Sequence, residues 1–494
     1  MPTHDCHQTN CAQGYLLTGF TTLDFVVLII YLGGITIWGA WLGRGNEGGT
    51  DYFLGSRSLP WVAVMLSIVA TETSTLTFLS IPGVSYSGSL VFFQLTLGYL
   101  LGRIFVSLFL LPAYYAGSLT TAYALLEERF GLGARRFTSA IFMVTRLLAD
   151  SVRLFATAIP LALITGWPYA VSIIVIGVLT LIYTYFGGIK AVVWVDAAQM
   201  MLYLFGALVA VIGIQALVPG GWSSVLASAR PEGKLAMLDL SFDRMTPYTL
   251  WAGVFGGAIF AMASHGTDQL IVQRLLTCRD RGAAQKALVG SGIAVIFQFF
   301  LFLMVGLGLW AFYEGRVFEK TDEIFALFIV EQLPPGITGL LIAGVFAAAM
   351  SSLSSSINSL ASATAYDYWA PIVGARDDEA RILRAGKVFT LLWAGLLTLG
   401  AVLFIPLSTG TTAVEVALGI ASLVYGGLLG AFALGVFTKR PGQISVIIGV
   451  AVGIGTVTLL RNEMAWPWYV LMGSAVTFAV GSFAGLFEDQ RHPA

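Results

Sequence analysis

Long runs of hydrophobic residues alternate with short polar stretches along almost the whole chain of 494 residues. A helix needs about 20 mainly apolar residues to cross a bilayer, and thirteen runs have that length. They lie near residues 22–43, 60–84, 89–113, 136–164, 168–186, 192–218, 248–276, 283–313, 337–363, 386–406, 412–437, 443–460 and 466–488. The pattern therefore predicts an all-α protein that spans a membrane about thirteen times, without a separate soluble domain.

The composition supports a membrane protein and excludes several other classes. Apolar residues make up 57% of the chain and charged residues only 11%, against about 25% charged residues in soluble domains. So few charges could not cover a surface in water, whereas apolar side chains face lipid at no cost. The net charge of −1 gives no basic balance for nucleic acid, and no metalloprotease or nucleophile motif indicates an enzyme.

The second and seventh runs are interrupted by small and polar residues at mid-depth. The second reads ATETSTLT at 70–77, followed by Pro82 and Gly83, and the seventh contains two glycines at 256–257 and ASHGTDQ at 263–269. The two runs lie five apart, as expected for inverted repeats whose first helices are broken. A break frees backbone carbonyls that an ion or a solute can satisfy. Flexible helices with glycines for close packing are the alternative.

The ninth run carries the strongest chemical signal, because five of the six residues 351–356 are serines. Several of them share one helical face. The positions on or beside that face are Ala348, Ser351, Ser352, Ser354 and Ser355. A hydroxyl stripe can join helices closely, or it can supply oxygen ligands to a hard cation. Packing alone needs fewer hydroxyls, so the stripe favours a cation site.

Asp196 lies early in the sixth run. A carboxylate at membrane depth is costly and usually functional, and near the serine stripe it would complete a site for a monovalent cation. An interfacial aspartate that water reaches is one alternative. A proton acceptor in a proton-coupled or uncoupled permease of the same fold is another, although a proton needs no cage of hydroxyls.

Four blocks of the sequence, taken together, are similar to the sodium:solute symporter family. They are ATETSTLTFLSIPG at 70–83, GGIKAVVWVDAAQ at 187–199, GTDQLIVQR at 266–274 and SSLSSSINSL at 351–360. The resemblance covers almost the whole chain and is nearest in motif to bacterial sialic acid symporters and to iodide and multivitamin transporters. It implies a symporter, driven by sodium ions, that imports a small solute by alternating access. The implied fold is the LeuT type, with two inverted repeats of five helices.

The resemblance also divides the chain, as a single transporter domain. A leading helix would occupy 22–43, the first repeat 60–218, the inverted second repeat 248–437 and two trailing helices 443–488. With the N-terminus outside and the C-terminus cytoplasmic, most of the 26 Lys and Arg residues lie in cytoplasmic loops. We therefore expect a multi-pass protein of the cell (inner) membrane. Its oligomeric state stays open, a monomer included.

Site residues follow from the resemblance, motif by motif. The main sodium site would use three carbonyls and two hydroxyls, from Ala70, Thr73, Ala348, Ser351 and Ser352. Some members have a second sodium site, whose positions match Ser351, Ser354, Ser355 and Asp196. The implied substrate positions in the second run are Ser74 and Thr77.

Polar residues in the third and fourth runs bear on the solute. Gln94 can hydrogen-bond a solute, or it can serve as a packing amide. The fourth run carries Arg146, Asp150 and Arg153, which leaves one positive charge in excess. Arg153 can therefore pair with a solute carboxylate. An internal pair of Arg153 with Asp150 at (i, i+3) is the alternative.

The sequence departs from the sugar transporters of the family around the solute. Leu76 stands where they have a glutamate, and Ser264 or His265 stands near their aromatic gate. An anionic organic solute is therefore favoured, and a sodium/sugar symporter is the alternative.

Overall fold

The computed structural model describes residues 20–117, 119–318, 321–405 and 413–488. This part of the chain is helical, and no strand occurs in it. The helices are α1 (Thr22–Leu42), α2 (Gly49–Leu54), α3 (Trp61–Glu72), α4 (Thr75–Ser87), α5 (Phe93–Phe105), α6 (Leu111–Ala116), α7 (Ala124–Phe130), α8 (Leu132–Thr165), α9 (Tyr169–Leu217), α10 (Gly221–Ala229), α11 (Gly257–Gly266), α12 (Gln269–Leu275), α13 (Arg281–Phe312), α14 (Ile324–Gln332), α15 (Ile337–Ala363), α16 (Ala370–Val373), α17 (Glu379–Phe404), α18 (Ala413–Phe437), α19 (Gln443–Leu460) and α20 (Pro467–Ala484).

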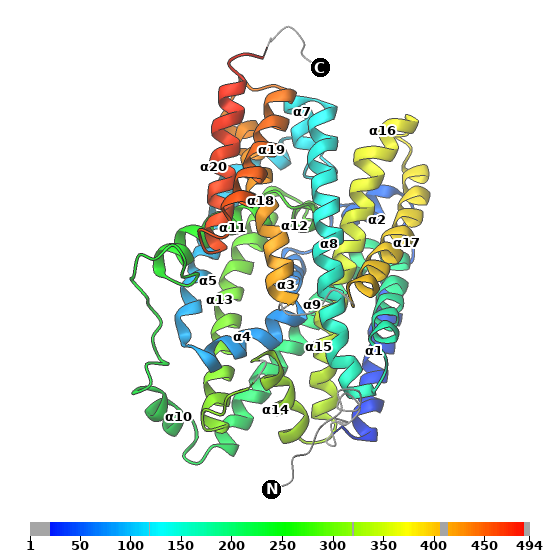
Figure 1. Ribbon diagram of the computed structural model, residues 1–494. Helices are drawn as coiled ribbons and strands as arrows, with labels where there is room; N and C mark the ends of the chain where they lie inside the picture. Colours follow the sequence, from blue (N-terminus) through cyan, green and yellow to red (C-terminus); the bar gives the residue numbers. More distant parts are fainter. Residues whose placement is uncertain (1–19, 118, 319–320, 406–412, 489–494) are drawn as a thin grey trace, which may run out of the picture.

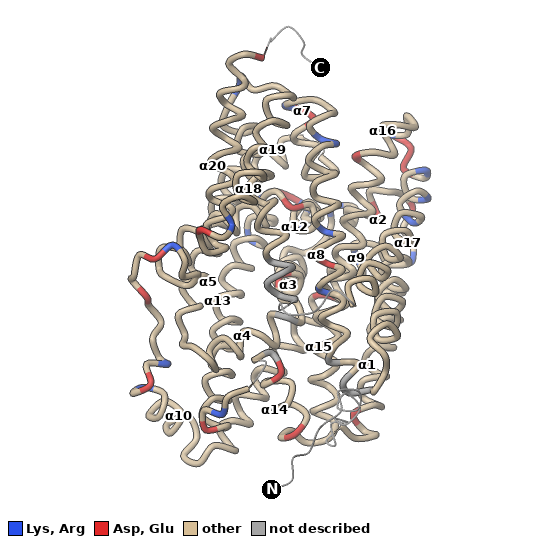
Figure 2. Tube along the Cα trace, viewed as in Figure 1, with Lys and Arg blue, Asp and Glu red and all other residues tan. Residues whose placement is uncertain are grey.

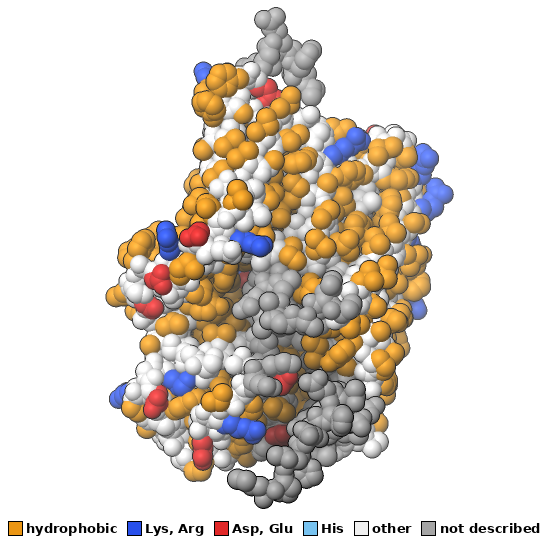
Figure 3. All heavy atoms as spheres, viewed as in Figure 1, with side chains coloured by type: hydrophobic (Ala, Val, Ile, Leu, Met, Phe, Trp, Pro, Cys, Tyr) orange, Lys and Arg blue, Asp and Glu red, His pale blue; other side chains and the backbone are white. Residues whose placement is uncertain are grey.

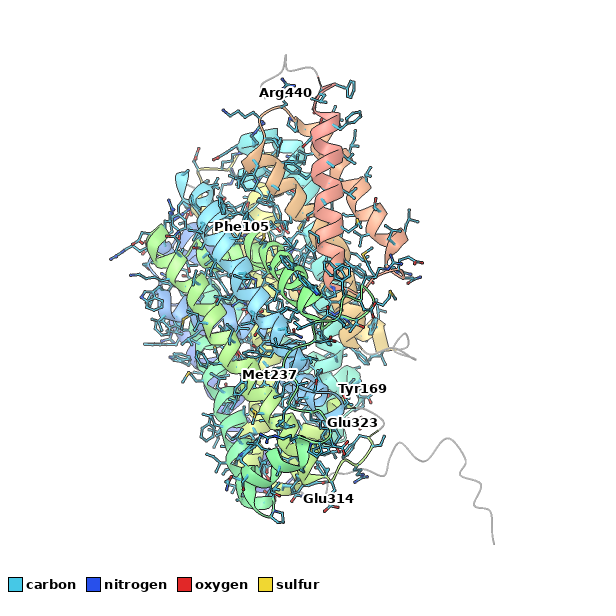
Figure 4. The ribbon with its side chains drawn as sticks, turned by 90° about the vertical axis from the view of Figure 1, so that its left-hand side faces the viewer. Phe105, Tyr169, Met237, Glu314, Glu323 and Arg440 are labelled. Atoms are coloured by element: carbon cyan, nitrogen blue, oxygen red, sulfur yellow. The ribbon has the colours of Figure 1, made fainter. Side chains whose placement is uncertain are left out.

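Most helices run along one long axis of the molecule. α1 begins at one end and α20 finishes at the other (Figure 1). Arg440, between α18 and α19, and Glu314, after α13, likewise lie at opposite ends (Figure 4). A chain that starts and finishes at opposite ends crosses an odd number of times, which is compatible with the thirteen predicted spans.

The number of spans is smaller when length and composition alone are counted. Nine helices of the described residues are long and apolar enough to cross a membrane, or ten when α3 and α4, bent by 60°, form one broken span. The three remaining predicted runs fall on α8, on one half of α9, and on the pair α11 and α12. The total of thirteen stays a prediction.

The helix α9 holds two predicted runs because the chain turns back at Gly188. Gly188 has φ 56° and ψ −154°, which interrupts the helix. A Cβ atom on Gly39 of α1 would meet Tyr183 before the turn at 2.8 Å and Val195 after it at 2.9 Å. Residues twelve apart on a straight helix would be about 18 Å apart. The two halves of α9 therefore lie side by side against α1.

The molecule exposes many large apolar side chains on its surface and buries many polar ones inside. Hydrophobic side chains cover most of the visible face (Figure 3), and large ones such as Ile30 and Ile37 are exposed. By contrast, every residue from 341 to 363 of the serine-rich helix α15 is buried. Charged residues lie largely at the periphery, along α17 and along the loop beside α5 and α10, with a few inside near α8 and α12 (Figure 2). A bilayer solvates such an apolar surface, whereas buried charges need partners within the protein.

Both predicted helix breaks are present. The first separates α3 from α4 at Thr73, whose ψ of 84° is not helical. The second separates α11 from α12 at Thr267. Ser74 caps α4 and Asp268 caps α12, since their side-chain oxygens accept backbone N–H groups. Helix α15 packs against α3, α4 and α12, so the serine stripe faces the broken helices.

Candidate ion and solute sites

The serine face of α15 lies directly against the first helix break. Thr75, at the start of α4, donates to the Val345 carbonyl at 2.9 Å. Thr71, near the end of α3, lies 3.3 Å from the hydroxyl of Ser355. The break is thus held against α15 at two points, Val345 and Ser355. The predicted ligands of both segments therefore lie in one region.

Asp196 is fully buried at the centre of this region. Ser351 donates to its Oδ1 at 2.7 Å, and Ser67 of α3 donates to its Oδ2 at 2.7 Å. Ser355 and Ser354 both donate to the Ser351 carbonyl, at 2.6 and 3.0 Å. The structure therefore brings together the four residues predicted for a second sodium site. The alternative prediction, an interfacial Asp196 that water reaches, is therefore wrong.

Arg274 of α12 is a member of this cluster that sequence reasoning missed. Its guanidinium is fully buried, 2.9 Å from Asp196 Oδ2, and it also donates to Ser67 and Ser355. The expectation that basic residues lie in cytoplasmic loops does not hold for Arg274, which is buried within a helix. The sequence did offer a signal, since the apolar neighbours of Arg274 at 270–272 and 275–276 indicate that it is buried. A buried arginine requires an acid beside it.

The carbonyls predicted for the main sodium site fit the break in the backbone. The Ser74 N–H donates to the Glu72 carbonyl at 3.1 Å, so the Ala70 carbonyl lacks its usual helical donor. Thr73 is buried beside it in non-helical backbone. On α15, Ser352 donates to the Ala348 carbonyl at 3.2 Å. Carbonyl and hydroxyl oxygens of this kind are ligands that a hard cation accepts.

A cavity of about 210 Å³ lies between the two broken helices. Ser74, Thr77 and Arg153, all predicted to bind the solute, line it together with Arg146. Seven aromatic rings form much of the rest of its wall. They form two chains of neighbouring rings, which are Tyr248, Phe92 and Phe299 in one and Tyr99, Phe260, Tyr425 and Trp466 in the other. The cavity therefore suits a solute that has both an apolar body and a charged group.

The excess positive charge expected in the fourth run is absent from the folded protein. Asp268, the cap of α12, forms an ion pair with Arg146, and Tyr425 donates to Asp268 at 2.7 Å. Asp150 lies 3.3 Å from Arg153 and 3.6 Å from Arg146. The two arginines are therefore balanced by two aspartates, because the chain brings Asp268 in from the second broken helix. The internal pair of Arg153 with Asp150 is present.

A second ion pair faces the cavity from the end of α3. Glu72 pairs with the fully buried Arg103, and its carboxylate is 3.8 Å from the His265 ring. Arg103 thus neutralises an acid. Gln94 is not among the residues that line the cavity. Its amide donates to the Tyr248 carbonyl at 3.0 Å, and it accepts the N–H of Asp239 at 3.2 Å.

Two broken helices around a cavity with both polar and aromatic walls are typical of a secondary transporter. The chain belongs to the sodium:solute symporter family, since the model of that family matches residues 52–453. It is therefore a sodium-coupled symporter, embedded in a membrane by several spans, with sodium and a small solute as its transported partners, and it is not an enzyme.

Individual relatives match over most of this chain. A sodium/sialic acid symporter, NanT, of Aliivibrio fischeri is 29% identical over 94% of this chain and 92% of its own. The human sodium/iodide cotransporter is 28% identical over 87% of this chain and 68% of its own.

Two solved structures share the fold. The substrate-bound outward-open state of a sodium-coupled sialic acid symporter matches with a TM-score of 0.87 and 27% identity, over 95% of this chain and 99% of that one. A nucleobase-cation-symport-1 family transporter matches with a TM-score of 0.53 and 13% identity, over 90% of this chain and 95% of that one. The second likeness concerns the fold alone. The fold is thus the LeuT type, as the motifs implied.

Proposed function

We propose that the protein imports an anionic organic solute together with sodium ions bound at the α15 face. The main site takes its ligands from Ala70, Thr73, Ala348, Ser351 and Ser352. A second site uses Ser351, Ser354, Ser355 and Asp196. The contacts of Ser351 with Asp196 at 2.7 Å and of Ser352 with the Ala348 carbonyl at 3.2 Å support both sets.

The anionic character of the solute rests on Arg153. Its side chain is 23% exposed and lines the cavity beside Ser74 and Thr77. The charge of Arg153 and the hydroxyl groups of Ser74 and Thr77 are together suited to hold a carboxylate. Relatives named as sialic acid and monocarboxylate transporters carry solutes of this charge. The aromatic walls fit an apolar body. Gln94 supports the fold beside the cavity and does not contact the solute.

For the topology, the proposal keeps the division into a leading helix (22–43), a first repeat (60–218), an inverted second repeat (248–437) and two trailing helices (443–488). The N-terminus is outside and the C-terminus cytoplasmic in the cell (inner) membrane. The basic loop at Arg440 and the loop at Glu314 lie at opposite ends (Figure 4), which agrees with the positive-inside rule.

The test is uptake into proteoliposomes under an inward sodium gradient, with a potassium gradient as the control. The panel holds sialic acids, monocarboxylates, vitamins, amino acids and neutral sugars. We expect sodium-dependent uptake of a carboxylate, which Arg153→Gln abolishes. A neutral sugar as the best solute, or full uptake of the carboxylate by Arg153→Gln, would contradict the assignment.

A further inference from the structure

A second, much smaller pocket lies beside the solute cavity, between the start of α4, the middle of α8 and α15. Its volume is about 10 Å³, which is room for about one water-sized occupant. Its polar lining consists of Ser74, Thr75, Asp150, Arg153, Thr157 and Ser352. Ser74 and Arg153 also line the large cavity, so these two residues form the wall between the two spaces.

Three of the hydroxyl groups that line this pocket have no proton left to donate to an occupant. Thr75 donates its only hydroxyl proton to the Val345 carbonyl at 2.9 Å, and Thr157 donates to the Arg153 carbonyl at 2.9 Å. Ser352 donates to the Ala348 carbonyl at 3.2 Å. A hydroxyl carries one proton and two lone pairs. With their protons committed to backbone carbonyls, these three oxygens can act only as acceptors toward an occupant.

Asp150 supplies the negative charge of the pocket and is only loosely neutralised. It is 4% exposed, and Ser356 donates to its Oδ2 at 2.5 Å. The nearest guanidinium nitrogens lie 3.3 Å away on Arg153 and 3.6 Å away on Arg146, beyond the 2.7–2.9 Å typical of strong charge-assisted bonds. Arg146 is committed mainly to Asp268. Arg153 is therefore the main partner that neutralises the charge of Asp150.

We propose that this pocket is a further monovalent-cation site, with Asp150 as its acid and Thr75, Thr157 and Ser352 as oxygen ligands, and that Arg153 controls it. This inference rests on the proposed anionic solute. A solute carboxylate draws Arg153 into the large cavity, and the cation then takes the place of the guanidinium at Asp150. The charge of the region is the same before and after, because one anion and one cation enter together.

The coupling is reciprocal by thermodynamic necessity. A cation at Asp150 competes with Arg153 and releases that side chain for the carboxylate, and the carboxylate releases Asp150 for the cation. The carboxylate alone leaves the buried Asp150 without a partner, and the cation alone leaves Arg153 without one, and both states are unfavourable. The pocket therefore links solute binding to cation binding through a single side chain.

The test needs no solute, because Arg153→Gln frees Asp150 permanently. The probe is sodium, in detergent, with choline as the replacement cation, and the readouts are bound ²²Na⁺ per protein and the sodium concentration for half-maximal thermal stabilisation. We expect Arg153→Gln to lower that concentration roughly tenfold relative to wild type, since a competing buried cation is gone, and to bind one more sodium ion.

Second substitutions in the Arg153→Gln background locate the gain. Thr157→Val, which replaces the hydroxyl by a methyl group, and Asp150→Asn should each abolish it, and Thr157→Ser should keep it. Thr145→Val is the matched control, because Thr145 is buried on the same helix and donates to the Ile141 carbonyl at 2.7 Å. If Arg153→Gln is unstable in choline, its recovery in sodium, absent from the Thr157→Val double variant, supports the site equally.

The outcomes separate this inference from the proposed function. If sodium stabilises the wild-type protein and Arg153→Gln shows neither tighter nor additional sodium binding, the proposed pocket site is wrong. The proposed sodium sites on α15 are then unaffected. A gain that survives Thr157→Val also overturns the pocket. No response to sodium in either protein overturns both.

Discussion

Two arginine–aspartate pairs inside this transporter have the same chemistry and different surroundings. The nitrogen and oxygen atoms of Arg274 and Asp196 are 2.9 Å apart, and both side chains are fully buried. Those of Arg153 and Asp150 are 3.3 Å apart, and Arg153 is 23% exposed toward the solute cavity. The first pair also has three serine hydroxyls around it, whereas Arg153 makes no second ion pair within the described residues.

The difference indicates two roles for one kind of ion pair. A sealed pair with satisfied hydrogen bonds fixes the helices that carry it, here α9 and α12, and removing one partner leaves a buried charge. A looser pair at a cavity wall can exchange its partner for a ligand of the same charge. We therefore expect the first pair to govern stability and sodium binding, and the second to govern the solute.

The largest effect is expected from Arg274→Gln. It leaves Asp196 unpaired in a fully buried position, at a cost of about 3–5 kcal/mol. The thermal unfolding temperature should therefore fall strongly in choline. It should fall less in sodium, because a sodium ion can neutralise Asp196. The double variant Arg274→Gln/Asp196→Asn should recover much of the loss. Arg279→Gln is the control, because the pair of Arg279 with Asp280 is exposed. Equal losses in the single and double variants would contradict the sealed pair.

Arg153→Gln should abolish uptake of the carboxylate solute and leave the protein folded, since its pair is partly exposed and Asp150 keeps the hydrogen bond from Ser356. Thermal stabilisation by sodium alone should persist. Arg153→Lys keeps the charge but loses the planar fork, so it should retain weak uptake. Normal uptake by Arg153→Gln would reduce the pair with Asp150 to a structural role.

Loss of single sodium ligands should have an intermediate effect. Ser351→Ala, Ser352→Ala and Asp196→Asn should each raise the sodium concentration for half-maximal uptake, by roughly tenfold for the loss of about 1.4 kcal/mol of binding energy. Asp196→Asn should also lower the ratio of sodium to solute. Ser359→Ala is a matched control on the same buried helix. Unchanged sodium dependence in all three would mean that these sites are misplaced.

Gln94→Leu is expected to have the smallest effect. It removes hydrogen bonds to the backbone of Tyr248 and Asp239 and should lower stability by about 1–2 kcal/mol. The solute concentration for half-maximal uptake should stay at the wild-type value in the same assay. A large rise in that concentration would place Gln94 in the solute site.

Local pattern was enough to predict the helical membrane fold, the two broken helices and the serine face of α15. Runs of apolar residues and mid-run polar blocks such as 70–77 are properties of contiguous sequence, and membrane physics turns them directly into spans and breaks. The motif resemblance added the residues that we propose as sodium ligands. Ser351 and Asp196 lie in two of the matched blocks, and the structure brings them to 2.7 Å.

The partners of the buried charges could be decided only by the tertiary structure. The count of charges within the fourth run missed Asp268, which comes from a broken helix far along the chain to pair with Arg146. Arg274 stands in one of the matched blocks, and only the fold shows that it is buried against Asp196. Which acid neutralises which arginine depends on distances of a few ångströms between helices remote in sequence, because the attraction that offsets the desolvation of a buried pair weakens as the two charges separate. Helix packing sets those distances, and the pattern along the chain does not.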